Sequence, residues 1–146
     1  MKKFTAPLII IGIMIFIGLI CVVIFYRPRY ESSHAMSIIE AKPHLKINLP
    51  DSANEIWILD QSVGPGHFLY MARFNIDSIE GIRWARSQGI DQEKKITSNP
   101  TKDRESPSWF DIESIQKGTQ FSNSKVPIIE IWVDELRNIV FYCESD

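Results

Sequence analysis

Three side chains of the types used in nucleophilic catalysis lie close together in the chain. Asp60, Ser62 and His67 flank a turn formed by Gly64-Pro65-Gly66, and they match the acid, nucleophile and base of a catalytic triad. A triad requires the acid to hold the base and the base to face the nucleophile, usually from separate rigid elements. Asp and Ser are also common turn formers. The spacing therefore favours an ordinary turn, with a small hydrolase as the alternative.

Residues that bind metals in proteins are scattered along this sequence. His34, His44 and His67 form no HxxxH or HExxH pattern, and Cys21 and Cys143 form no CxxC pair, so the spacing of known metal sites is missing. Cys143 lies in a predicted strand and is expected to be a buried core residue, with an intermolecular disulfide as the alternative. We assign no residue to catalysis, to a cofactor or to a metal.

Aromatic residues are the main candidates for binding a partner. Four tryptophans follow residue 50: Trp57, Trp84, Trp109 and Trp132. Some of them are expected to fill the core, and tryptophan is also enriched at protein interfaces. Trp84 lies off the apolar stripe of a predicted helix and is therefore expected to be exposed at an interface. Arg73 and His67, on the non-core side of a predicted strand, complete the candidate partner-binding set.

The charge balance argues against nucleic acid as a partner. The chain has 16 basic and 18 acidic residues. Without Lys2 and Lys3 it retains 14 basic and 18 acidic residues, a net charge of −4. No basic patch is indicated. The Gly64-Pro65-Gly66 turn is not followed by the Lys-Ser/Thr pair of a phosphate-binding loop.

Periodicity and turn signals predict an α+β domain of two layers. The expected elements are a strand hairpin over 55–60 and 67–76, a helix over 78–88, a loop over 91–108, a short helix over 109–117, and a second hairpin over 126–133 and 138–144. Asp77 is expected to cap the first helix and Gly89 to end it, and its apolar stripe is expected to follow Ile79, Ile82, Arg86 and Ile90. This order predicts an antiparallel sheet of about four strands with the helices on one face. The residues expected in the core are Phe68, Tyr70, Phe74, Ile131 and Val133.

The N-terminus carries a long apolar run. Residues 6–26 contain no charged side chain, and basic residues flank them on both sides. As a helix this run extends for roughly 30 Å, which matches the hydrocarbon core of a bilayer. It predicts an uncleaved transmembrane helix, with a cleaved signal peptide and a lipoprotein modified at Cys21 as alternatives. The lipid bilayer is thus an expected partner through residues 6–26.

The predicted organisation is a short basic tail (1–5), the membrane span (6–26), a tether (27–48) and the α+β domain (49–146). Short basic tails normally stay in the cytoplasm, so the positive-inside rule predicts a single-pass protein whose C-terminal domain is extracytoplasmic, in the periplasm.

Short motifs resemble a loose class of small uncharacterised bacterial proteins with one N-terminal span or lipid anchor. The motifs are Leu49-Pro50-x-Ser52-Ala53, Arg73-Phe74, Trp109-Phe110-Asp111 and Ile139-Val140-Phe141-Tyr142. The resemblance implies the architecture and no activity. The expected function is a membrane-tethered domain of the cell envelope that binds a protein without catalysis. The alternatives are the small hydrolase and a structural or assembly subunit that acts through its span.

Overall fold

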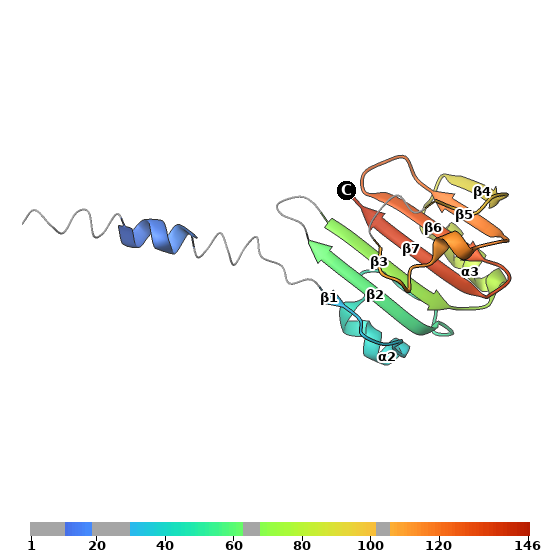
Figure 1. Ribbon diagram of the computed structural model, residues 1–146, viewed down its shortest axis with the longest axis horizontal. Coiled ribbons are helices and arrows are strands. Elements are labelled where there is room, and N and C mark those ends of the chain that lie inside the picture. The colour runs from blue at the N-terminus through green and yellow to red at the C-terminus, as the bar shows by residue number, and fades with distance from the viewer. Residues whose placement is uncertain (1–10, 19–29, 63–67, 102–105) are drawn as a thin grey trace, which may run out of the picture.

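Seven strands form one antiparallel sheet, which is the central feature of the structure (Figure 1). The computed structural model describes residues 11–18, 30–62, 68–101 and 106–146. The strands are β1 (Tyr30–Glu31), β2 (Asn54–Ser62), β3 (Phe68–Asn75), β4 (Gln92–Ile96), β5 (Gly118–Ser122), β6 (Ile128–Asp134) and β7 (Ile139–Ser145). Their order in the sheet is β1-β2-β3-β7-β6-β5-β4.

The two predicted hairpins are confirmed and lie side by side in the centre of the sheet. β2 pairs with β3 and β6 pairs with β7, both antiparallel. β7 also pairs with β3, so that Ala72 lies opposite Tyr142. The chain leaves β3 through helix α3 (Ser78–Ser87), which crosses β5, β6 and β7 before β4 begins at the far edge. The sheet thus continues on both sides of the predicted hairpins.

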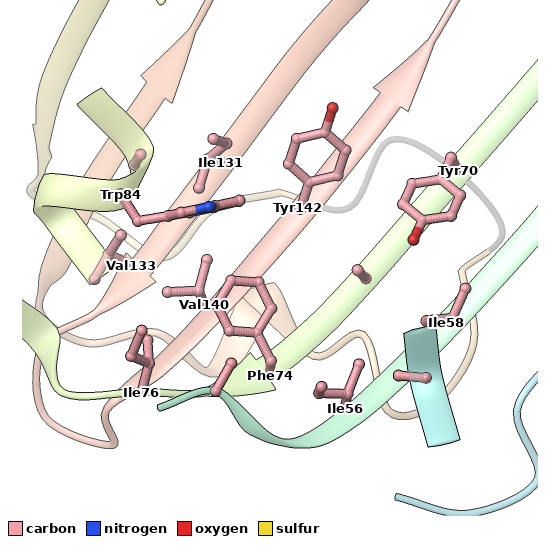
Figure 2. Packing of buried hydrophobic residues seen from close by; sticks show 14 of the residues in the cluster. Ile56, Ile58, Tyr70, Phe74, Ile76, Trp84, Ile131, Val133, Val140 and Tyr142 are labelled. Atoms are coloured by element: carbon pink, nitrogen blue, oxygen red, sulfur yellow. The ribbon is translucent and has the colours of Figure 1, made fainter. Parts of the chain in front are cut away.

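The first face of the sheet carries the larger apolar core, shown in Figure 2. Four of the five expected core residues are fully buried in it: Tyr70, Phe74, Ile131 and Val133. Phe68 is half-buried. Phe74 meets the Trp84 ring edge-on at 5.2 Å, and the Trp84 indole N–H donates to the Asn48 carbonyl at 2.7 Å. Apolar packing on this face is accompanied by a satisfied polar group.

Helix α3 begins and ends as its sequence indicates. The Asp77 carboxylate accepts hydrogen bonds from the backbone N–H groups of Ile79 and Glu80, and Gly89 follows the helix with a φ of 72°, which glycine adopts without strain. The predicted apolar stripe is only partly correct, because Ile82 and Ile90 pack against the core but Ile79 does not. Ile79 is 68% exposed and Trp84 is 7% exposed, because the helix buries the side on which the small Gly81 allows close approach to Val140.

The second face of the sheet is also covered, so the prediction of two layers with one covered face is wrong. Residues 106–117, including the 3-10 helix η2 (Ile112–Ser114), pack against it, on the opposite side from α3 in Figure 1. Leu69 and Met71 alternate with the first-face residues of β3 and belong to this second core. Both faces of β3 are apolar because both are buried.

Three strands were missed, so the predicted four-stranded sheet is wrong. β5 begins at Gly118, which was expected to stop a helix, and β4 lies in the expected 91–108 loop. β4 is an exposed edge strand with one apolar residue, Ile96. It is held by its ladder to β5 and by Lys95, whose Nζ lies 2.6 Å from both Thr119 Oγ1 and Glu135 Oε1. A strand held by pairing instead of side-chain burial lacks an apolar period in its sequence.

Residues 30–48, expected to be part of a tether, belong to the folded domain. β1 pairs with β2, and Met36 forms a β-bridge with Ile56. The short helix α2 (Ile38–Ala41) opens with a capping box between Ser37 and Glu40, and the 3-10 helix η1 (Lys42–His44) continues from it. Met36 and Ala41 are buried. The tether prediction is wrong here because few apolar residues, widely spaced, anchor this segment.

The described N-terminal part does not support the expected membrane span. Residues 11–18 are helical. Within the described residues, no helix is both long and apolar enough to cross a bilayer. Residues 6–10 and 19–26 of the expected span lie outside the described part. The prediction of a transmembrane helix is contradicted by this finding, and the single-pass, extracytoplasmic location that depended on it is wrong with it.

Candidate functional site

Two tryptophans and an arginine gather where the second face of the sheet is open to solvent. Trp57 on β2 and Arg73 on β3 are direct cross-strand partners. The Trp109 ring, which comes from the segment covering this face, stacks on Trp57 with 6.1 Å between centroids and 25° between planes. All three residues are half-buried. We call this group the Trp57–Arg73–Trp109 patch.

A β-bulge determines which face Trp57 occupies. The β2–β3 register shifts by one residue between Asn54 and Trp57, and Glu55 within the bulge has a φ of 48°. A one-residue shift moves every following side chain to the other face. Without it, Trp57 would lie on the first face beneath α2. The left-handed conformation of a glutamate costs of order 1 kcal/mol. The fold tolerates this strain at Glu55, and the bulge formed there places Trp57 beside Arg73.

The Arg73 guanidinium is partly removed from water without a close counter-charge. Burial lowers the pKa of Arg73, while the nearby carboxylates of Glu55 and Asp111 oppose that shift. Among the described residues, no carboxylate lies within ion-pair distance of Arg73. Asp111 lies 3.9 Å from Arg137 instead, and Glu55 accepts a hydrogen bond from Asn75 at 2.7 Å. A partly desolvated guanidinium is an unfilled binding position for a carboxylate.

Two buried polar atoms in and beside the patch lack hydrogen-bond partners among the described residues. The Trp109 indole N–H and the Asn75 side-chain carbonyl oxygen are both buried, and neither makes a hydrogen bond within the described part of the chain. Leaving such a group unpaired costs about 1–3 kcal/mol. In native proteins the exceptions are few and frequently mark functional positions. The patch therefore combines exposed aromatic surface with hydrogen-bonding groups that an added ligand can satisfy.

A cavity lies farther along the same face, toward the end of β7. Its volume is about 230 Å³. Its lining consists of Met71, Pro100, Thr101, Ser106, Phe110, Ile112, Gln120, Glu130, Trp132 and Cys143. Trp132 is 5% exposed, and its indole N–H is a second buried donor that finds no acceptor among the described residues. The predicted burial of Cys143 is confirmed, at 4% exposed.

Of the three residues predicted from the sequence to bind a partner, one lies in the Trp57–Arg73–Trp109 patch. Arg73 lies in the patch. Trp84 is buried under α3 and bonded to Asn48, so its expected exposure is wrong. His67 lies outside the described residues. Sequence reasoning did not select Trp57 or Trp109, although the unusual number of tryptophans indicated that some of them serve an interface.

The residues considered for catalysis or metal binding do not assemble into a site in the described part of the chain. Asp60 makes an ion pair with Lys46 at 2.6 Å, and the His67 that would complete the triad is not described, so the hydrolase alternative stays a prediction. His44 stacks on Tyr30 with 3.7 Å between centroids. Across the described ranges, no three His, Cys, Asp or Glu side chains gather closely enough to hold a metal ion.

No protein family, curated protein or solved structure matches this chain.

Proposed function

We propose that this protein is a non-enzymatic binding domain that captures an acidic segment of a partner protein at the Trp57–Arg73–Trp109 patch. The observation that carries the proposal is the half-buried Arg73 guanidinium, which lies next to Trp57 without an ion pair among the described residues. Arginine and tryptophan are the residue types most enriched in the energetic centres of protein interfaces.

The patch supplies both parts of such a contact. The stacked rings of Trp57 and Trp109 offer apolar area whose conformation is already fixed, so little entropy is lost on binding. A partner carboxylate on Arg73 gains a charge-assisted, bidentate pair in a partly desolvated position. A backbone carbonyl of the partner can accept from the Trp109 indole N–H, which lacks an acceptor in the structure. These contacts favour an extended acidic peptide.

The test is a comparative capture experiment followed by direct binding. Tagged wild-type protein, Arg73→Ala and Arg83→Ala are incubated with the same extract, and proteins retained by the wild type are identified. Arg83 is the matched control because it is exposed on α3, over the opposite face. We expect a partner that Arg73→Ala loses and Arg83→Ala retains. Its purified form should bind Arg73→Ala about 30-fold more weakly, as loss of an interface centre worth about 2 kcal/mol implies.

Two further measurements make the result specific. Binding of the identified partner should weaken as salt rises for the wild type and depend less on salt for Arg73→Ala, because the carboxylate contact is the ionic one. Trp57→Ala should weaken binding to a similar degree. A partner that binds the wild type and Arg73→Ala equally would refute the proposal, whatever its identity.

A further inference from the structure

The cavity at the end of β7 has the features of a small-molecule site that are independent of the patch. Apolar side chains, among them Met71, Phe110 and Trp132, form about half of its wall. Polar side chains, among them Gln120 and Glu130, form the rest. Apolar walls joined by polar groups that can fix the orientation of a ligand are typical of ligand pockets.

The indole N–H of Trp132 specifies one property of the ligand. Trp132 is 5% exposed, lines the cavity, and donates no hydrogen bond to any residue that the structure describes. The Phe110 ring meets Trp132 edge-on at 6.1 Å and fixes the indole in place. A buried N–H that has no protein acceptor gains a hydrogen bond when a ligand brings an acceptor to it. The ligand therefore carries a carbonyl, hydroxyl or ether oxygen.

The volume of the cavity and the charge in its wall narrow the class of ligand further. A 150 Å³ apolar cavity holds a benzene ring, so about 230 Å³ accommodates one ring with a short substituent. The Glu130 carboxylate in the wall disfavours an anionic acceptor such as a carboxylate. We infer that the cavity binds an uncharged, single-ring molecule whose oxygen accepts a hydrogen bond from the Trp132 indole N–H.

Three probes of matched size test this with the full chain. Acetophenone has a neutral ring and a carbonyl acceptor, isopropylbenzene has the same number of non-hydrogen atoms without the acceptor, and benzoate has the acceptor with a negative charge. In proton–nitrogen NMR spectra, the Trp132 indole resonance is assigned as the one missing from Trp132→Phe. Acetophenone should shift this resonance saturably. Isopropylbenzene should bind about tenfold more weakly, the worth of one neutral hydrogen bond, and benzoate weaker still.

Matched variants then separate the hydrogen bond from general loss of packing. In Trp132→Phe, the preference for acetophenone over isopropylbenzene should fall below about twofold. Trp109→Phe also removes a buried, unpartnered indole N–H but lies outside the cavity lining, so it should keep the tenfold preference. Because the ratio of two affinities is compared, a variant that binds both probes more weakly still gives an answer.

A second measurement places the ligand without relying on Trp132. Cys143 lines the cavity, and Cys21→Ser leaves it as the one cysteine in the chain. In that background, acetophenone should slow modification of Cys143 by methyl methanethiosulfonate in proportion to its occupancy. The inference is overturned if acetophenone shifts no indole resonance, if wild type binds acetophenone and isopropylbenzene equally, or if Trp132→Phe keeps the preference. Should Trp132→Phe not fold, the wild-type affinity ratio and the Cys143 protection decide the outcome.

Discussion

The two faces of the sheet treat the same side chain differently. On the first face, the buried Trp84 donates its indole N–H to the Asn48 carbonyl. On the second face, Trp109 and Trp132 bury their N–H groups without an acceptor in the described ranges of the chain. The first face holds a continuous core in which the Trp84 indole N–H is satisfied, whereas the second face has two unpaired indole N–H groups and an arginine without an ion pair among the described residues.

This difference indicates that the two faces of the sheet serve different purposes. Satisfied polar groups and close packing stabilise a fold. Unsatisfied polar groups lower the stability of the folded protein, but they can form hydrogen bonds with a ligand or partner that binds to it. We interpret the first face as the source of stability and the second face as the source of binding. The following predictions test that interpretation through matched pairs of substitutions.

The largest expected effect comes from removing a core phenylalanine from each face. Phe74→Ala should lower the free energy of unfolding by about 3–5 kcal/mol, because Phe74 is fully buried among well-packed neighbours. Phe110→Ala should lower it by at least about 1 kcal/mol less, because the adjoining cavity already deprives Phe110 of contacts and gives its neighbours room to relax. Urea unfolding of both variants measures the difference. Equal losses would contradict the proposed difference in packing.

A smaller effect is expected when each face loses one indole N–H. Trp84→Phe and Trp132→Phe remove similar volume, but the first leaves the Asn48 carbonyl without its donor, while the second removes a group that had no partner. Trp84→Phe should therefore be less stable than Trp132→Phe by about 1–3 kcal/mol. The comparison uses chemical denaturation in the absence of ligands. If Trp132→Phe were the less stable variant, the interpretation that the first face is the source of stability would be contradicted.

Replacing Arg73 should separate binding from stability. Arg73→Met keeps the alkyl packing and removes a partly desolvated charge, so the free energy of unfolding should change by less than about 1 kcal/mol, toward greater stability. Arg83→Met on the exposed side of α3 provides the baseline for an ordinary surface arginine. Thermal and urea unfolding give both values. A loss of more than about 2 kcal/mol in Arg73→Met would show that Arg73 serves the fold.

The smallest expected effect depends on pH and concerns the edge strand. The hydrogen bond from Lys95 lowers the pKa of Glu135 in the folded protein. A carboxyl whose pKa is lowered by folding stabilises the folded state above its ordinary pKa of about 4.3, and this contribution disappears as pH falls below that value. Glu135→Gln should thus cost up to about 1 kcal/mol at pH 7 and almost nothing at acid pH. Stability measured for both proteins across this range checks the sign.

The predictable parts of the fold were those with local signals. The Asp77 cap, the Gly89 stop and the two hairpins were found because turn chemistry and period-two apolar residues are encoded in adjacent positions. β4, β1 and the packing of residues 30–48 were not found, because edge pairing and a few separated anchors such as Met36 and Ala41 leave no periodic pattern. The second covered face was not predicted, because Leu69 and Met71 were interpreted as facing solvent on a strand with only one buried face.

The candidate site was accessible from sequence only in part. Arg73 was selected because it lies on the non-core side of a strand that was correctly placed. Trp57 was out of reach because its face depends on a bulge at Glu55, which nothing in the local sequence marks. Its stacking with Trp109 joins segments about 50 residues apart. Trp84 was misplaced because the helix buries its smallest residues, a choice that depends on the shape of the sheet beneath.

The position of β7 has a consequence for how the protein is made. β7 is the last of the seven strands along the chain, yet it lies in the middle of the sheet between β3 and β6. While the chain emerges from the ribosome, β1-β2-β3 and β4-β5-β6 can form only as two half-sheets, each with an unpaired inner edge. The two halves join when residues 139–145 become available, so both cores are completed after the other six strands have been synthesised. Any delay at that point leaves β3 and β6, the most apolar strands, as the surfaces through which nascent chains would pair with one another.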